Sequence, residues 1–460
     1  MNEPGSKRRA YVETYGCQMN ISDGELMEGV LESNGYLIVA TPEEADVVLI
    51  NTCAIREHAE KRVLGRVAQL NGLKRERPDV VIGVTGCMAQ RLGETLLEQA
   101  PYVDLVMGPD GYRALPQTLA SLEQRREAPG ARTSKRGPQL AVLDLSLGEN
   151  YQGLEQRRAE GPTAWLPIQR GCDHRCTFCI VPYVRGPEKN RAAPEILKEV
   201  RGLVETGVTE VTLLGQTVNS YEWGDWNFPR LLSDVARVDG IQRVRFTSPH
   251  PNDVTPELVG VMATEAAVCE QLHLPAQSGN NRTLKRMLRR YTVEKLLEKV
   301  ELVRSAIPDI ALSTDIIVAF PGETDEEYED TLDLMREVRF DEAFTYKYSL
   351  REGTPATKLP EEDFIDPDLA QARLEGLIEV SRAIQAEINA AEVGRVERVL
   401  IERKGRREGQ ILGRTRRNKV VVFDGEPARA GEYTVVELQT TTGATFAGRE
   451  VAGPAMAGLK

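Results

Sequence analysis

Six of the seven cysteines in this 460-residue chain fall into two groups of three, and the tighter group constrains the chain most. Cys172, Cys176 and Cys179 follow a β-rich segment and the turn at Arg170 and Gly171. Three thiolates on one short loop can bind one metal centre. Structural zinc needs a fourth ligand, and His174 has the wrong spacing to supply it. A four-iron cluster held by three cysteines leaves one iron open for chemistry, so the loop predicts an iron-sulfur site.

The second group is Cys17, Cys53 and Cys87, which are far apart in the sequence. Each cysteine directly follows a predicted strand, in VETYG, VLINT and IGVTG respectively. The carboxyl ends of parallel strands share one edge of a sheet, so these residues can become three ligands of one site. Three separate core cysteines would not explain the shared position. The seventh cysteine, Cys269, is interpreted as a small buried hydrophobic residue.

Short β-rich runs alternate with helical stretches through about residue 350, which predicts α/β units with parallel strands. The first 120 residues contain three candidate strands: Ala10 to Tyr15, Asp46 to Asn51 and Val80 to Val84. Six more follow: Trp165 to Gln169, Glu210 to Leu214, Arg243 to Thr247, Gln271 to Pro275, Ile310 to Ala319 and Ala343 to Leu350. We therefore expect an α/β protein with an N-terminal parallel-sheet domain and a central partial (β/α)6 barrel.

The expected domain boundaries follow shifts in composition. Residues 8–125 form the first domain, and the charged, Gly- and Pro-rich residues 126–157 form a linker in which AVLDL can form one short strand. Residues 158–390 form the partial barrel and end in a long amphipathic helix. In residues 391–455, apolar and polar residues alternate between glycine turns, which predicts a small antiparallel β-barrel.

The charge distribution sets this last domain apart. The chain has a formal net charge of -12, which argues against a nucleic-acid partner, but residues 391–460 carry 13 Lys and Arg against 9 Asp and Glu. We expect an RNA-binding positive face on this barrel, although a solvated run of charges is the alternative. Its candidate residues are Arg403, Lys404, Arg406, Arg407, Arg414, Arg416, Arg417 and Lys419.

Four polar residues at predicted strand ends are candidates for binding a cofactor: Gln216, Ser248, His273 and Gln277. Functional residues of βα barrels lie at the carboxyl ends of the strands. The alternative for each residue is turn chemistry or polar packing.

The chain has no apolar stretch long enough to span a membrane, and its first residues have no apolar core of the kind found in signal peptides. A cytoplasmic location and no membrane partner are expected. Seven cysteines are too few for a disulfide scaffold in a chain of this length.

The chain resembles a known family along most of its length. The CxxxCxxC loop at the head of six βα units resembles the radical S-adenosylmethionine superfamily, and both triads together resemble the methylthiotransferases, in detail those of the MiaB tRNA type. The closing barrel, with GRTRRNKVVVF, resembles a TRAM domain. The further matching segments are TYGCQMNISDGE, NTCAIRE, TGCMAQR, QRGCDHRCTFCIVPYVRG, LLGQTVNSY, FTSPHP, LHLPAQSG, DIIVAFPGET and YKYSLREGTPA.

The resemblance implies two [4Fe-4S] clusters and the use of two S-adenosylmethionine molecules per cycle. The Cys172, Cys176 and Cys179 cluster would cleave one of them to generate a radical. The auxiliary cluster at Cys17, Cys53 and Cys87 would receive a methyl group from the other. The product would carry a methylthio group at carbon 2 of isopentenyladenosine next to the anticodon of tRNA. A low-potential electron donor of the flavodoxin or ferredoxin type and a monomeric state are also expected.

Other functions stay open at this point. Relatives with the same chemistry act on threonylcarbamoyladenosine in tRNA or on an aspartate of a ribosomal protein. The chain could instead be an iron-sulfur electron carrier, but a carrier needs neither open iron positions nor an RNA-binding domain. A zinc-dependent RNA-binding module lacks the required ligand count. One position departs from the family pattern, since RGPEKNR has Asn190 where a serine is usual.

Overall fold

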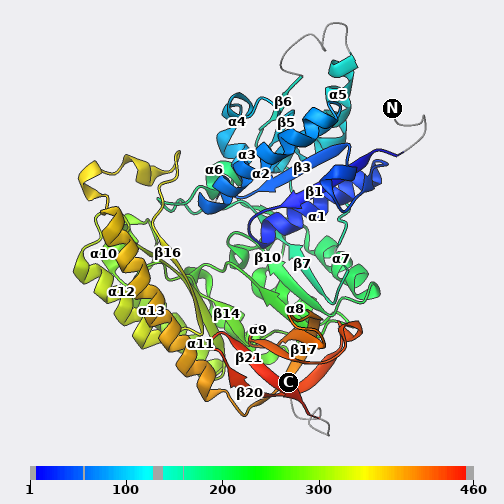
Figure 1. Cartoon of the computed structure of the whole chain (residues 1–460). Helices are drawn as coiled ribbons and strands as arrows, with labels where there is room; N and C mark the ends of the chain where they lie inside the picture. Colours follow the sequence, from blue (N-terminus) through cyan, green and yellow to red (C-terminus); the bar gives the residue numbers. More distant parts are fainter. Residues whose placement is uncertain (1–6, 55–56, 128–137, 159, 452–460) are drawn as a thin grey trace. The chain divides into compact units, whose positions relative to one another are not determined.

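The computed structural model describes residues 7–54, 57–127, 138–158 and 160–451 (Figure 1). The chain divides into two compact units. The first comprises residues 1–159, 169–175 and 179–189, and the second comprises residues 160–168, 176–178 and 190–460. Residues 128–137 of the predicted linker and residues 452–455 of the predicted last domain lie outside the described residues.

The first unit is built on a parallel sheet of six strands, and its three predicted strands are confirmed. The strands stand in the order β2 (Leu37–Ile38), β1 (Arg9–Thr14), β3 (Val47–Thr52), β4 (Val81–Gly86), β5 (Leu105–Met107) and β6 (Leu140–Val142). Every residue of β3 and β4 is buried. Strands covered on both faces are expected to be continuously apolar, as these two largely are.

Helices cover both faces of this sheet (Figure 1). One face packs against α1 (Gln18–Ser33) and α5 (Leu115–Glu127). The other packs against α2 (Glu57–Glu76), α3 (Cys87–Leu92) and α4 (Thr95–Gln99). The predicted parallel-sheet domain is therefore confirmed, and the helices on both faces make it a doubly wound α/β domain.

Residues 138–157 of the predicted linker contain the one short strand that the sequence allows, and they pack onto the rest of the first unit. Leu140–Val142 forms β6, which pairs in parallel with β5. Tyr151 is buried, and its ring stacks on that of Tyr112 at 5.9 Å between centroids. Arg158 then pairs with Glu25 of α1 at 3.0 Å. A few apolar and aromatic side chains thus fix a segment whose composition is otherwise that of a linker.

The second unit begins with the predicted partial barrel, and all six of its predicted strands are present. Three form the parallel sheet β7 (Thr163–Pro167), β10 (Glu210–Leu214) and β13 (Arg243–Phe246). The other parallel sheet contains β14 (Gln271–His273), β15 (Ala311–Val318) and β16 (Glu342–Lys347). A parallel bridge between Val244 and Val268 connects the two halves.

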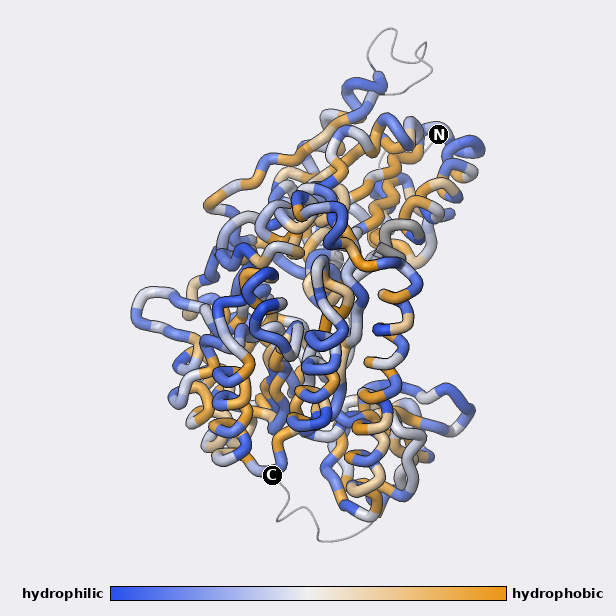
Figure 2. The backbone as a smooth tube through the Cα atoms, turned by 90° about the vertical axis from the view of Figure 1, so that its left-hand side faces the viewer, coloured by the Kyte–Doolittle hydropathy of each residue, from blue (hydrophilic) through white to orange (hydrophobic). Residues whose placement is uncertain are grey.

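The barrel helices pack on one face of these strands and share one apolar core with them (Figure 1). They are α7 (Ala193–Glu205), α8 (Phe228–Ala236), α9 (Pro256–Thr264), α11 (Val293–Ala306), α12 (Asp325–Val338) and α13 (Pro367–Ala391). Helix α9 starts at the N-cap Thr255, and α12 starts at a capping box of Thr324 and Glu327. Hydrophobic residues gather in the packed elements, whereas many connecting loops are hydrophilic (Figure 2).

The last strands form a closed five-stranded barrel around its own apolar core. They are β17 (Val396–Lys404), β18 (Gln410–Arg414), β19 (Val420–Asp424), β20 (Tyr433–Thr441) and β21 (Thr445–Glu450). The predicted barrel is confirmed, but it is not wholly antiparallel. Strand β21 inserts between β20 and β19 and runs parallel to β19. Within the described ranges, no helix combines the length and apolarity required of a membrane span.

Candidate metal centres

Cys17, Cys53 and Cys87 lie at the carboxyl edge of the first unit's sheet. Cys53 and Cys87 directly follow β3 and β4, and Cys17 is the N-cap of α1, three residues after β1. The strand order reverses between β1 and β3, and ligands of open α/β sheets bind at such a point. A Cβ placed on Gly16, the residue before Cys17, would lie 2.6 Å from the Cβ of Cys53, so the sheet brings these distant residues together.

Glycines make the turns out of the strands possible at this edge. Gly16 and Gly86 have φ of 137° and 91°, in the region that favours glycine. A Cβ at Gly16 would lie 2.6 Å from the Cβ of Cys53, and a Cβ at Gly86 would lie 2.5 Å from the carbonyl oxygen of Thr52. The backbone therefore approaches too closely for any larger residue before Cys17 or Cys87.

Two asparagines frame the same edge. The side-chain nitrogen of Asn20 donates to the carbonyl oxygen of Thr52 at 2.9 Å. That of Asn51 donates to the carbonyl oxygen of Asn20 at 2.7 Å. These buried bonds hold the first turn of α1, which Cys17 caps, against the end of β3.

The thiols of this triad differ in acidity. The hydrogen bond with Cys53 lowers the pKa of Cys17 to about 6; burial opposes this effect and the charge of Arg185 adds to it. Burial raises the pKa of Cys87, although Arg185 acts against it. The Arg185 Nε donates to the Cys87 sulfur at 3.1 Å, and Nη2 donates to Asp23 Oδ2 at 2.6 Å. A buried cation thus lies beside the predicted metal ligands, where it stabilises thiolate charge.

The cysteine loop is anchored within the first unit up to Cys172 and again from Cys179 onward. The side chain of Asp110, fully buried, pairs with Arg170 at 3.1 Å and with Lys189 at 2.7 Å. The guanidinium carbon of Arg170 also lies 3.4 Å from the ring centroid of Tyr151. The two ends of the loop segment therefore attach to the same carboxylate.

Gly171 lies at positive φ directly before a cysteine, as Gly16 and Gly86 do in the first group. It directly precedes Cys172, has φ of 76°, and a Cβ there would lie 1.9 Å from the carbonyl oxygen of Pro187. The Cys172 backbone N–H donates to the carbonyl oxygen of Gly186 at 3.1 Å. A close pass of two backbone segments thus fixes the first cysteine of the loop.

Cys176 belongs to the second unit, where it is buried. The Arg289 Nη1 donates to its sulfur at 3.4 Å, and Arg289 Nε donates to the Tyr291 hydroxyl oxygen at 3.1 Å. The Tyr291 hydroxyl lies 2.9 Å from the carbonyl oxygen of Pro275 and 2.8 Å from that of Ala276. The carbonyl oxygens after β14 thereby hold Tyr291, which in turn holds Arg289 against the Cys176 sulfur.

Gln216, Ser248 and Gln277 follow the carboxyl ends of β10, β13 and β14, as the sequence predicts. The buried Gln216 Oε1 has no hydrogen-bond partner among the described residues. Ser248 and Gln277 have φ of 58° and 68°, and Ala319, which sequence reasoning missed, has φ of 57° just after β15. Non-glycine residues held at positive φ at three strand ends are typical of a functional edge.

His273 lies within β14 rather than on a rim loop. Its ring nitrogens lie 3.0 Å from Ser313 Oγ and 3.2 Å from Asp315 Oδ2, both on β15. Leu272 and Leu312 belong to the core packed under the helices, so the polar group faces the opposite side of the sheet. His273 therefore contributes to the inner face of the partial barrel.

The donor sets fit iron-sulfur clusters. Each group offers three thiols, and each has an arginine that donates to one sulfur: Arg185 to Cys87 and Arg289 to Cys176. N–H···S bonds are common around such clusters. The buried, unpartnered Arg185 Nη1 adds an unused donor at the first group. Sequence reasoning missed both arginines, because only spatial contact distinguishes them from ordinary basic residues.

The structure separates the eight predicted RNA-binding residues. Arg403, Lys404, Arg406 and Arg407 are exposed at the turn between β17 and β18, whereas Arg414, Arg416, Arg417 and Lys419 lie at the other end of β18. They therefore lie in two separate groups, of which only the first is exposed. Arg416 pairs with Glu270, Arg417 with Glu392 and Glu397, and Lys419 with Asp341, all inside the second unit. Arg414, half-buried, pairs with Glu402 at 3.1 Å.

Arg416, Arg417 and Lys419 are paired because they lie at a buried junction between the closing barrel and the partial barrel. From β13, Arg243 donates to the carbonyl oxygens of Arg398 and Arg414, at 2.6 and 2.8 Å. Arg245 donates to those of Thr415 and Arg416, both at 2.8 Å. Four charge-assisted bonds to backbone carbonyls thus hold the closing barrel on the partial barrel: one reaches β17, one reaches the end of β18, and two reach the turn after β18.

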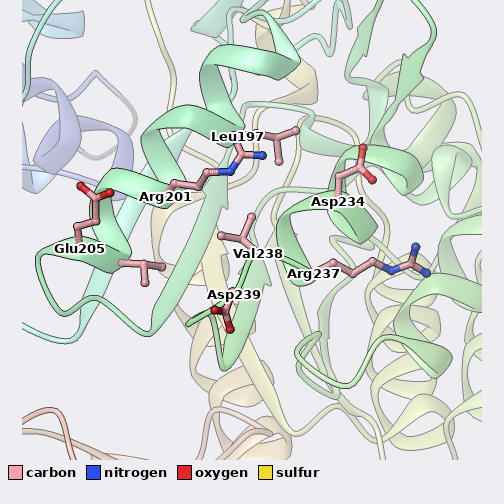
Figure 3. Close-up of a pocket in the computed structure, with 8 residues that line it drawn as sticks. Leu197, Arg201, Glu205, Asp234, Arg237, Val238 and Asp239 are labelled. Atoms are coloured by element: carbon pink, nitrogen blue, oxygen red, sulfur yellow. The ribbon is translucent and has the colours of Figure 1, made fainter.

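A surface groove of about 580 Å3 lies between α7 and α8 (Figure 3). Leu197, Val204 and Val238 form its apolar part, and Arg201, Asp234 and Arg237 are among its charged residues. None of the predicted site residues lines it. The groove belongs to the outer helix layer, and its lining does not include the strand ends that carry the candidate residues.

Family models match three regions of the chain. Residues 9–108 match the uncharacterized protein family UPF0004, residues 166–335 match the Radical SAM superfamily, and residues 390–448 match the TRAM domain. Among solved structures, the radical S-adenosylmethionine methyltransferase TsrM from Kitasatospora setae aligns with a TM-score of 0.56 at 14% identity. That alignment covers 88% of this chain and 77% of TsrM. Because the sequence identity is low, this alignment supports only the fold.

Curated relatives match nearly the whole chain. The tRNA-2-methylthio-N(6)-dimethylallyladenosine synthase of Carboxydothermus hydrogenoformans is 43% identical over 96% of this chain and 98% of its own length. The enzyme of the same name from Chloroherpeton thalassium is 43% identical over 96% of each chain. With both cysteine triads in the matched regions, the chain belongs to the tRNA-2-methylthio-N(6)-dimethylallyladenosine synthase family of radical S-adenosylmethionine enzymes.

Proposed function

We propose that this protein inserts a methylthio group at carbon 2 of isopentenyladenosine next to the anticodon of tRNA. One observation carries the proposal: a single chain holds a gathered strand-end triad and a CxxxCxxC loop. Either feature alone fits many iron-sulfur proteins, but together they supply one site for sulfur and one for radical generation. The names of the curated relatives support this substrate over threonylcarbamoyladenosine or a ribosomal-protein aspartate.

In this proposal each triad holds one [4Fe-4S] cluster. Cys172, Cys176 and Cys179 would hold the radical cluster, and Cys17, Cys53 and Cys87 the auxiliary cluster. When bound, the first would supply an electron to cleave S-adenosylmethionine, and the second would supply the site for the transferred sulfur and methyl group. Three protein ligands per cluster leave one iron of each free for another ligand.

The chain's own residues would bind and shield S-adenosylmethionine, of which two are used per cycle. Gln216, Ser248 and Gln277 follow the carboxyl ends of the barrel strands, and His273 lies on the inner face. We assign the cofactor contacts to these four residues. The unpartnered Gln216 Oε1 can accept a hydrogen bond from the cofactor's amino group or ribose hydroxyls.

The exposed turn with Arg403, Lys404, Arg406 and Arg407 would contact the tRNA backbone. Arg416, Arg417 and Lys419 are already paired with carboxylates inside the second unit, so we leave them out of the tRNA contact. Replacing the four turn residues by glutamine should weaken tRNA binding and flatten its salt dependence, by roughly 0.7 to 0.9 in slope for each phosphate that is no longer neutralised.

The control for that experiment is Arg449→Gln, which removes an exposed charge elsewhere on the same barrel. Its tRNA affinity and salt slope should stay close to those of the unmodified protein. Point substitutions are preferable to removal of the barrel, because truncation would leave Arg243 and Arg245 without four backbone acceptors. Unchanged salt slope in the four-residue variant would move tRNA recognition away from this turn.

We further propose three working domains: residues 8–125 with the auxiliary cluster, to whose sheet residues 138–157 add β6, residues 158–390 with the radical cluster, and residues 391–455 for RNA binding. The three matched family regions support this division, since each domain corresponds to one of them. A monomeric enzyme in the cytoplasm, where its tRNA substrate is found, and a low-potential donor of flavodoxin or ferredoxin type complete the proposal.

The decisive experiment compares modified nucleosides in tRNA from cells with and without this protein. Loss of 2-methylthio-isopentenyladenosine with accumulation of isopentenyladenosine is expected. Complementation should succeed with the unmodified gene and fail with Cys53→Ala. An unchanged 2-methylthio content in the deletion strain would overturn the proposed function.

A further inference from the structure

Arg185 lies where one structural element connects ligands of both cysteine groups. Helix α6 (Val181–Arg185) begins two residues after Cys179, and Arg185 is its last residue. Ile180 and Val184 form a buried apolar cluster with Cys87 and Ala54, and Ala54 directly follows Cys53. These contacts all lie within the first unit. A five-residue helix of about 7.5 Å therefore runs from one predicted cluster ligand to the surroundings of the other triad.

The guanidinium of Arg185 is held in a defined orientation. Its Nε donates to the Cys87 sulfur at 3.1 Å, and its Nη2 donates to Asp23 Oδ2 at 2.6 Å. Arg185 is 2% exposed and Asp23 is 1% exposed. A buried arginine with one carboxylate partner has lost its hydration, so both contacts act in a medium where charge is weakly screened.

The remaining nitrogen of the guanidinium, Nη1, indicates that a ligand binds beside Arg185. Buried Nη1 has no hydrogen-bond partner among the described residues, and neither has the nearby Tyr112 hydroxyl oxygen. Leaving a buried donor unpaired is unfavourable, and native proteins rarely retain one without a partner or purpose. A cluster sulfide beside Cys87 would be a suitable acceptor for this N–H group.

We propose that Arg185 is a positioning residue of the auxiliary site, which holds Cys87 as a ligand and raises the reduction potential of the cluster bound there. The inference rests on the proposed function for the identity of the cluster. Hydrogen bonds to cluster sulfurs and nearby positive charge both favour the reduced, more negative state. Asp23 partly offsets this charge and fixes the arginine, so the two residues should act in opposite directions on the potential.

The test uses the full-length protein with Cys172, Cys176 and Cys179 replaced by alanine, so that only the auxiliary cluster is present. Iron and sulfide per chain are measured, and the midpoint potential is determined by redox titration monitored by electron paramagnetic resonance. Arg185→Met should lower the potential enough to change the ratio of oxidised to reduced cluster about tenfold, which corresponds to 59 mV for one electron.

Two further variants separate charge from hydrogen bonding. Arg185→Lys keeps the charge and should give a potential between those of the parent and Arg185→Met. Asp23→Asn removes the opposing charge and should raise the potential. The control is Arg125→Met, which removes an exposed charge of α5 in the same unit and should leave the potential unchanged.

The outcomes are distinguishable. A parent protein without cluster iron would refute the auxiliary site itself, and thus the proposed function. A loaded parent whose potential and iron content are unchanged in Arg185→Met would overturn only the role of Arg185. If Arg185→Met loses its iron while Arg185→Lys retains it with a shifted potential, the positioning role stands.

Discussion

The two cysteine triads obtain their geometry in different ways. Cys17, Cys53 and Cys87 are fixed by three strands of a buried sheet, and the core of the whole first unit supports their positions. Cys172, Cys176 and Cys179 share one loop, whose ends are held by ion pairs with Asp110. The first triad is therefore as rigid as the sheet, whereas the second depends on a few polar contacts. A substitution at one of these supports should therefore affect one centre and spare the other.

The largest effects should come from the ligands themselves. Cys176→Ala should reduce cleavage of S-adenosylmethionine more than ~100-fold, since even residues that only support metal ligands contribute 10–100-fold. Cys53→Ala should retain cleavage but form no methylthiolated product. The measurements are 5′-deoxyadenosine formation, iron content and nucleoside analysis of tRNA. Normal product formation by Cys53→Ala would show that the strand-end triad is not a reaction site.

Asp110→Asn tests the loop's anchoring. The substitution leaves two buried cations, Arg170 and Lys189, without their carboxylate, which should cost about 3–5 kcal/mol of stability. We expect the loop triad to lose iron first and cleavage activity to fall, while the strand-end triad keeps its iron. The measurements are iron per chain and thermal unfolding. Glu25→Gln, at a less buried pair with Arg158, is the matched control.

Equal loss of iron from both triads in Asp110→Asn would contradict this distinction. It would mean that Asp110 supports the whole first unit rather than the loop. The strand-end triad can be followed separately when the same substitution is placed in the protein that lacks the three loop cysteines.

Glycine substitutions compare the two triads at equivalent positions. Gly86→Ala and Gly171→Ala each place a Cβ at positive φ directly before a cysteine, at about 1–3 kcal/mol of backbone strain plus a steric clash. Gly86→Ala should lower the iron of the strand-end triad, and Gly171→Ala that of the loop triad. Gly148→Ala, where a Cβ meets nothing within 4 Å, is the control. Indistinguishable iron contents in all three variants would show that these turns tolerate a Cβ.

The sequence predicts the triads, the strands and the barrels because each has a local signal. Cysteine spacing marks the loop, and cysteines after β-rich runs mark the sheet edge. What the sequence could not predict depends on long-range contact. Composition made residues 138–158 resemble a linker, but Tyr151 and β6 attach them to the sheet.

The prediction that the basic residues of the last domain form an RNA-binding face was partly wrong, also because it depends on long-range contacts. Arg416 and Lys419 look like exposed basic residues in the sequence, yet each finds a carboxylate in the partial barrel. Arg185 belongs to the matching segment that contains the three loop cysteines, but only its contact with Cys87 shows which group of cysteines it serves. Long polar side chains can reach partners far away in sequence, and periodicity does not report such partners.

The smallest effect is expected from the substitution of Cys269. This substitution tests whether the cysteine outside the two triads is a metal ligand. This residue is 2% exposed, and burial raises its pKa even though Arg245, Arg416 and Arg243 lie nearby. Its surroundings therefore favour a neutral thiol that fills space. Cys269→Ala should lower stability by about 1 kcal/mol in thermal or denaturant unfolding, and leave the iron content and cleavage of S-adenosylmethionine unchanged. A loss of iron in this variant would make Cys269 a ligand, and the grouping of the other six cysteines would have to be redrawn.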